Sequence, residues 1–309
     1  ILNNLFLTVA AATVLLGTLY PLLLEGLTGA KISVGAPFFN MTFGPMIIPL
    51  LVAVPFGPMH AWKRGDLLGV AQRLVGVAAL AFVGVLVVSW IKWGGPVLAP
   101  LGIGLGLWLI AGAVFEILWR IKFTRASLNE SWRRLTSLPR ASFGTMLAHA
   151  GLGVTVLGIV ATSAWREELI TVMKPGDTAG IAGYSVTFDG AAPRRGPNYT
   201  EQVGQFTVRA GGAVVAVLEA AKRVYIAPRQ PTSEAGIKSF LSGDLYAVLG
   251  DPAVEGGFTV RIYNNPLVTL IWWGAYIMVM GGALSLSDRR LRVGAPRRAR
   301  LPAQAAPAE

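Results

Sequence analysis

Residues 142–161 read SFGTMLAHAGLGVTVLGIVA, an apolar run in which His149 is the only ionisable side chain. The hydrocarbon core of a bilayer is about 30 Å thick, and a helix of about 20 apolar residues crosses it. The run therefore predicts a membrane-spanning helix. An imidazole at that depth is costly unless it faces other helices and has a partner, so His149 is the first candidate functional residue.

The composition of the whole chain also indicates a membrane protein. Apolar residues make up 53% of it and charged residues 14%, whereas soluble domains carry roughly 25% charged residues. The absence of cysteine excludes disulfides and thiolate ligands from this chain. A net charge of +11 would suggest nucleic-acid binding in a soluble protein. Here the basic residues flank apolar runs, which favours contact with membrane lipid and predicts no nucleic-acid binding.

Hydropathy along the chain predicts about six membrane-spanning helices. The second of them is interrupted by four prolines, which are tolerated at depth when neighbouring groups satisfy the freed carbonyls. The expected spans are residues 5–24, 43–62, 68–90, 97–119, 141–164 and 266–286.

Basic residues are unevenly divided among the connections between these spans. They cluster at residues 63–64, 120–140 and 289–300, whereas the short connections 25–42 and 91–96 carry one lysine each. The positive-inside rule therefore predicts that both termini are cytoplasmic and that residues 166–265 lie on the far side of the membrane.

The far-side segment contains alternating apolar and polar runs that are typical of strands. These runs include residues 184–188, 205–210, 214–218, 245–249 and 258–263, and Gly211–Gly212 predicts a tight hairpin. We expect a β-rich domain of about six strands, serving either as a lid over the helices or as a docking surface. The predicted fold is a polytopic α-helical membrane protein with this domain inserted between its last two helices. Its parts are residues 1–165, 166–265, 266–288 and a basic, disordered cytoplasmic tail, 289–309.

Helical spacing places Thr145, Met146, Leu152 and Gly153 around His149. Neutral imidazole is the commonest metal ligand among side chains, and Gly153 leaves room for a flat ligand beside it. Two interpretations stay open on the residues alone. His149, with Gly153 beside it, holds a ligand, or it bonds to a neighbouring helix while the glycines serve packing.

Three other polar residues are weaker candidates. His60 lies at the cytoplasmic edge and is interpreted as an interfacial histidine. Glu116 is expected to pair with Arg120 one turn along the same helix. Arg73 reaches back to the interface. With two histidines and no cysteine, the chain is a poor candidate for a multi-ligand zinc site.

Motifs along the chain give it a resemblance to the CcmF family of cytochrome c biogenesis proteins. The similarity runs from about residue 2 to residue 290, in one order, through membrane and soluble parts. The motifs are TLYP (18–21), ISVGAPFFN (32–40), LAHAGLGVTVLGI (147–159), MKPGD (173–177), YSVTF (184–188), AKRVY (221–225), TSEAGI (232–237), DLYAVLG (244–250) and VRIY (260–263).

The resemblance implies a subunit of a haem lyase in the bacterial inner membrane, with residues 166–265 in the periplasm. Members of the family receive haem from CcmE. They act with CcmH and CcmI to attach it to the Cys-x-x-Cys-His motif of apocytochrome c. They also hold a b-type haem between two transmembrane histidines, and the AHAG motif matches the second of these. His149 would then be an axial ligand of haem iron.

The resemblance covers only the C-terminal half of the family's proteins. The second axial histidine is therefore expected from an N-terminal half, either a separate subunit or the remainder of a longer chain. Catalytic residues for thioether formation are not assigned here. The haem would carry electrons or serve as a structural cofactor. Two other hypotheses stay open. The chain could be a scaffold that docks partners without its own cofactor, and then replacing His149 would not affect a chromophore. It could also be a transport subunit whose proline-broken span lines a substrate path.

Overall fold

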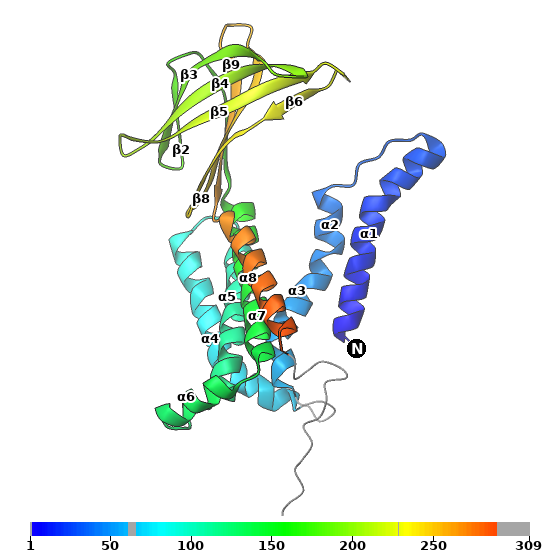
Figure 1. Cartoon of the computed structure of the whole chain (residues 1–309), viewed down its shortest axis with the longest axis vertical. Coiled ribbons are helices and arrows are strands. Elements are labelled where there is room, and N and C mark those ends of the chain that lie inside the picture. Colours follow the sequence, from blue (N-terminus) through cyan, green and yellow to red (C-terminus); the bar gives the residue numbers. More distant parts are fainter. Residues whose placement is uncertain (1, 61–65, 228, 289–309) are drawn as a thin grey trace, which may run out of the picture.

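The computed structural model describes residues 2–60, 66–227 and 229–288, and confirms a polytopic helical protein with a β-rich domain (Figure 1). Within that part of the chain, five helices are long and apolar enough to cross a membrane, or six if one bent pair counts as a span. The five are α1 (Leu2–Thr28), α4 (Leu67–Ile91), α5 (Ala99–Arg120), α7 (Arg140–Trp165) and α8 (Thr269–Leu286). The predicted tail, residues 289–309, lies outside the described residues.

The proline-rich span is broken rather than straight. It consists of α2 (Ala36–Thr42), α3 (Gly44–Ala53) and the 3₁₀-helix η1 (Val54–Met59), with a bend of 47° between α2 and the rest. Prolines lie in the first turn of each of the three pieces, where a missing N–H costs no helical hydrogen bond. The expected bounds of 43–62 were therefore wrong at the start, because the apolar path begins one short helix earlier.

Glycines let α7 approach two helices closely. Gly144, Gly151 and Gly158 lie two turns apart on the face toward α8, and a Cβ on Gly151 would lie 2.7 Å from the carbonyl oxygen of Gly274. On another face, a Cβ on Gly153 would lie 2.7 Å from the carbonyl oxygen of Gly106 in α5. Such close approach of backbones is the usual basis of helix packing in membranes, where dispersion replaces the hydrophobic effect. The α7 helix is therefore held between α5 and α8.

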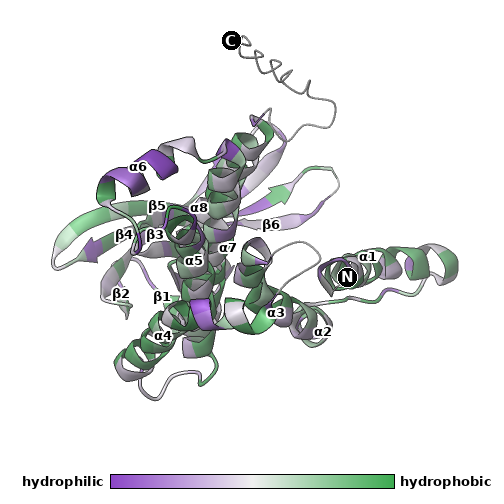
Figure 2. Ribbon diagram, turned by 90° about the horizontal axis from the view of Figure 1, so that it is seen from below, coloured by the Kyte–Doolittle hydropathy of each residue, from purple (hydrophilic) through white to green (hydrophobic). Residues whose placement is uncertain are grey.

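One helix was not predicted. Helix α6 (Leu128–Ser137) lies across the end of the bundle opposite the β-domain and is the most polar helix (Figures 1 and 2). The Ser127 hydroxyl caps it by accepting the N–H of Glu130 at 3.3 Å, and Glu130 pairs with Arg133 and Arg134. The Ser-x-x-Glu spacing is the sequence signal for this start, and it lies in a segment that the basic charge led us to treat as a connection.

The β-domain is a sandwich of two antiparallel sheets. One has the order β1-β9-β8-β7 and the other β2-β3-β4-β5-β6. The estimate of about six strands was too low, since four strands of four to seven residues escaped the search for alternation. The strands are β1 (Glu167–Met173), β2 (Thr178–Ile181), β3 (Tyr184–Arg195), β4 (Tyr199–Ala210), β5 (Ala213–Tyr225), β6 (Pro231–Glu234), β7 (Gly236–Phe240), β8 (Gly243–Pro252) and β9 (Phe258–Pro266).

Alternate residues of these strands form the core between the sheets. Phe188 and Phe206 are fully buried, with ring centroids 5.1 Å apart, and Leu249 and Ile262 are buried with them. The predicted hairpin at Gly211–Gly212 joins β4 to β5, and both glycines have positive φ (56° and 85°), as a two-residue turn requires.

The first and last strands of the sandwich, β1 and β9, are both connected directly to membrane helices. Only Arg166 separates α7 from β1, and β9 leads to α8 through residues 267–268. Strands β1 and β9 pair with each other, and the Thr162 hydroxyl of α7 donates to the carbonyl of Pro266 at 3.0 Å. The guanidinium of Arg166 lies 5.1 Å from the ring centroid of Tyr263. The junction is therefore a continuous, bonded structure.

Candidate functional site

His149 lies within α7, on the side of that helix that carries Gly153 and faces α5. Its side chain is half-buried. The nearby Thr145 hydroxyl donates to the carbonyl of Ala141 at 3.0 Å. Among the described residues, none forms a hydrogen bond with the imidazole of His149. An unbonded imidazole on a membrane-spanning helix is costly. The ring is therefore available to a ligand or to a group outside the described residues.

Glu116 of α5 is the charged group that interacts electrostatically with the imidazole of His149. The carboxylate is 3% exposed. As predicted, it pairs with Arg120, whose Nη2 lies 2.7 Å from Oε1. Its second oxygen, Oε2, is buried and has no hydrogen-bond partner among the described residues. The sequence suggested the ion pair, but proximity to His149 depends on the rotation of α5 against α7.

The room that Gly153 leaves is occupied by α5. A Cβ at this position would meet the Gly106 carbonyl oxygen and Ile110 Cγ1, each at 2.7 Å. In this structure the glycine lets two helices close on each other beside His149, and the face it leaves bare is covered by protein.

The other candidates make local contacts of their own. His60 follows η1 and its backbone N–H bonds to the carbonyl of Gly57 at 3.2 Å. Arg73 places its guanidinium 4.9 Å from the ring centroid of Trp119. The described ranges contain no group of three or more His, Cys, Asp or Glu side chains able to hold a metal. His149 could therefore give one ligand to a metal centre whose other ligands come from elsewhere.

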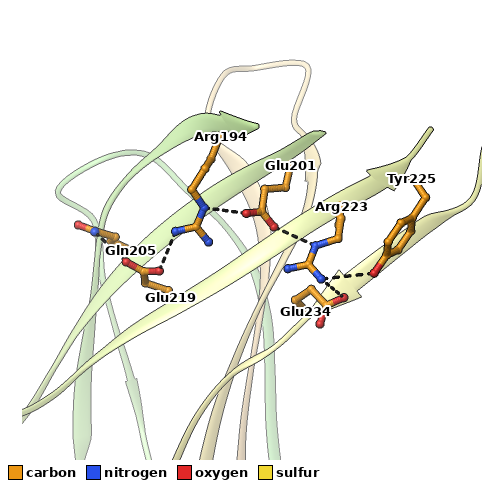
Figure 3. Close-up of polar contacts among 7 residues, drawn as sticks. All are labelled: Arg194, Glu201, Gln205, Glu219, Arg223, Tyr225 and Glu234. Atoms are coloured by element: carbon orange, nitrogen blue, oxygen red, sulfur yellow. Dashed lines mark hydrogen bonds and ion pairs between the residues drawn. The ribbon is translucent and has the colours of Figure 1, made fainter. Parts of the chain in front are cut away.

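A second polar cluster lies on the five-stranded sheet of the sandwich (Figure 3). Arg194, Glu201 and Arg223 occupy directly paired positions on β3, β4 and β5. The Glu201 carboxylate is 1% exposed and accepts from Arg194 Nε at 2.7 Å and from Arg223 Nε at 3.0 Å. Arg223 continues the row to Glu234 of β6 at 3.3 Å, and its guanidinium lies 4.0 Å from the Tyr199 ring centroid. The row ties four strands together, which indicates a structural role.

This row makes the stability of the sandwich sensitive to acid. Burial acts to raise the pKa of Glu201, but hydrogen bonds from Arg194 and Arg223 outweigh it and hold the pKa below its usual range. Because the folded state prefers the ionised form, the stabilisation is complete above the unfolded pKa of Glu201. It is lost as the pH falls through the folded pKa, which is lower than the usual pKa of a glutamate. We expect Glu201→Gln to lower the free energy of unfolding by about 2 kcal/mol at neutral pH. This is less than the loss expected on breaking a fully buried ion pair, because the two arginines reach water.

Thermal unfolding of the full chain in detergent, followed by circular dichroism between pH 3 and pH 7, measures this effect. The matched control is Glu219→Gln, because Glu219 also contacts Arg194, at 3.3 Å, but is 50% exposed. The control is expected to shift stability by less than about 0.5 kcal/mol. Equal effects of the two substitutions, or acid sensitivity that survives Glu201→Gln, would contradict the assignment.

Comparison with known proteins places these features in a family. The family model described as CcmF C-terminal beta-sandwich matches residues 164–266, which cover the whole sandwich. The cytochrome c-type biogenesis protein CycK of Rhizobium meliloti (strain 1021) is 55% identical over 300 residues, covering 97% of this chain and 44% of the relative. The cytochrome c-type biogenesis protein CcmF of Escherichia coli (strain K12) is 33% identical over 295 residues, covering 94% of this chain and 43% of the relative.

A solved structure, named Cytochrome c Heme Lyase CcmF, superposes with a TM-score of 0.69 at 22% identity, over 93% of this chain and 45% of that one. At this identity the likeness concerns the fold. The chain spans about half the length of the curated relatives that it matches. Relatives named CycK and CcmF match this chain over nearly its whole length, and the family model matches the β-sandwich between its last two helices. The chain therefore belongs to the CcmF family of cytochrome c-type biogenesis proteins.

Proposed function

We propose that this chain is the C-terminal half of a cytochrome c haem lyase and that His149 is one axial ligand of a b-type haem in the membrane. The observation that carries the proposal is the half-buried imidazole of His149, without a hydrogen-bond partner among the described residues, on a membrane-spanning helix. Family membership supports it, since a similar solved protein is named a haem lyase and the relatives are named for cytochrome c biogenesis.

The donors that the chain offers fit one half of such a site. A single imidazole supplies one axial position, and the chain has no cysteine to compete as a ligand. The second axial histidine is proposed to come from the N-terminal half of the protein. When bound, the haem would supply one-electron chemistry to keep substrate haem iron reduced.

Residues of this chain would hold the His149 imidazole in position and set its surroundings. Helix α7 holds His149 in place because glycines seat it against α5 and α8. Gly153 brings α5, the helix that carries the Glu116–Arg120 ion pair, close to α7. The residues that form the thioether bonds are not assigned to this chain.

The sandwich is the proposed docking surface for the other components: CcmH, CcmI, haem-loaded CcmE and apocytochrome c. It projects from the end of the bundle opposite α6 (Figure 1). The haem proposal is tested by the visible spectrum of the protein purified together with its N-terminal half, with His149 and with His149→Ala. A spectrum unchanged by the substitution would overturn the ligand assignment.

We also propose an orientation in the bacterial inner membrane, with the sandwich periplasmic and α6 cytoplasmic. Because the chain has no cysteine, single cysteines report it directly. For Val254→Cys the position is a fully exposed residue of the β8–β9 turn, and for Asn129→Cys it is an exposed residue of α6. A membrane-impermeant maleimide added to cells with a permeabilised outer membrane is expected to label position 254. Position 129 should react only after lysis, and the reverse pattern would contradict the topology.

A further inference from the structure

The end of α5 opposite the sandwich is closed by a turn in which a lysine takes the place usually given to glycine. Lys122 donates its N–H to the carbonyl of Trp119, and Phe123 donates to the carbonyl of Leu118, both at 3.1 Å. This is the Schellman pattern, whose left-handed position is usually glycine. Lys122 occupies it with φ at +53°. A side chain kept in a strained backbone conformation raises the question of what it contacts.

The turn forms one side of a pocket of about 280 Å³. One part of its lining is apolar and belongs to the last turns of α5 and to Phe123. The other part carries Lys122 and Arg125, both exposed. The complete lining is Phe115, Leu118, Trp119, Lys122, Phe123, Thr124 and Arg125. The pocket is thus amphipathic, with a hydrocarbon-like wall beside a cationic rim.

The cations around this pocket lack anionic partners in the described part of the chain. Arg125 and Arg73 place their guanidinium carbons 4.8 and 4.9 Å from the ring centroid of Trp119, so both cations lie against the same ring. Neither they nor Lys122 has a carboxylate within ion-pair distance among the described residues, whereas neighbouring Arg120 is paired with Glu116. Cations without a carboxylate partner, beside an apolar wall, fit a ligand with a phosphate and a hydrocarbon chain.

We propose that this pocket binds an anionic phospholipid. Its phosphate would lie between Lys122 and Arg125, and an acyl chain would run along Phe115 and Leu118. The position at the end of a membrane-spanning helix, on the side of the bundle where polar α6 lies, is the level at which headgroups sit (Figures 1 and 2). Charge complementarity and the apolar wall favour a membrane lipid over a soluble anion.

Lys122→Gly separates lipid binding from folding. Glycine suits the left-handed position, so we expect a higher melting temperature, while loss of the charge weakens lipid retention by about fivefold. Arg125→Gln is expected to weaken it by a similar factor, and Lys122→Arg to keep it. The matched control is Arg133→Gln, which removes one positive charge from exposed α6 outside the pocket.

Native mass spectrometry of the full chain in detergent measures retention of phosphatidylglycerol against phosphatidylcholine with the same acyl chains. Preferential retention of phosphatidylglycerol, lost in Lys122→Gly and Arg125→Gln and kept in the control, supports the site. Equal loss in Arg133→Gln would show diffuse attraction, and unchanged retention in Lys122→Gly would exclude the pocket. Competition by glycerol phosphate at similar concentration would assign the site to a soluble phosphate, and each of these three results overturns the lipid proposal.

Discussion

We expect the reduced low-spin b-type spectrum of the proposed haem to disappear, or to become high-spin, when His149 is replaced by alanine. Alanine offers no donor to iron, and α5 and α8 leave no room for α7 to rotate another residue into the place of the imidazole. Without His149 the haem would be held by the N-terminal half alone, so it would be bound more weakly and partly lost during purification. The absorption spectrum of the dithionite-reduced protein, with a pyridine haemochrome assay for haem content, measures the change.

The matched control for this experiment is His60→Ala, because His60 is the chain's other histidine. It follows η1 and has no place in the proposed site, so the spectrum is expected to stay as in the wild type. If His60→Ala removes the chromophore while His149→Ala retains it, the axial ligand is misassigned. If both variants keep it, the haem belongs to the N-terminal half and this chain is a membrane scaffold with a docking domain.

The second large effect is expected from Gly151→Leu. A Cβ at this position would lie 2.7 Å from the Gly274 carbonyl oxygen and 2.9 Å from the backbone nitrogen of Met278. Backbone atoms cannot move aside as a flexible side chain does, so α8 must separate from α7. We expect the free energy of unfolding to fall by about 3 kcal/mol, at the upper end of the costs of overpacking. Much of the protein would then aggregate or be degraded. Size-exclusion chromatography and the melting temperature in detergent measure it.

Gly76→Leu is the control for added bulk in a spanning helix, because no atom lies within 4 Å of a Cβ built on Gly76 in α4. That variant is expected to fold like the wild type. A normal elution profile for Gly151→Leu, or equal damage from both substitutions, would show that the α7–α8 contact does not limit stability.

The sequence alone predicted the features that depend on local composition. The apolar run around His149 became α7, and the runs at 184–188 and 245–249 became parts of β3 and β8. The Gly211–Gly212 turn was found because its geometry depends on two adjacent residues. Packing by the glycines of this run was one of two interpretations of the sequence. Gly144, Gly151 and Gly158 do contact α8 closely, but the sequence did not say which helix they would meet.

The features that the sequence did not predict depend on contacts between distant segments. Glu116 and His149 lie on different helices, so their proximity follows from how α5 is rotated against α7. The strands β6 and β7 are short, and pairing with β5 and β8 defines them better than alternation does. The path of the proline-rich span reflects packing too, since Phe38 and Phe39 of α2 fit against Gly17 of α1.

The double attachment of the sandwich has a mechanical consequence. A domain attached through one linker can rotate about it. This sandwich is attached through two helices, because α7 and α8 continue almost directly into the paired strands β1 and β9. We expect a force applied to the sandwich to reach α7 directly, because only Arg166 lies between α7 and β1. His149 lies roughly 24 Å along α7 from that junction, at 1.5 Å per residue, so we expect a tilt of the sandwich to shift the imidazole as well.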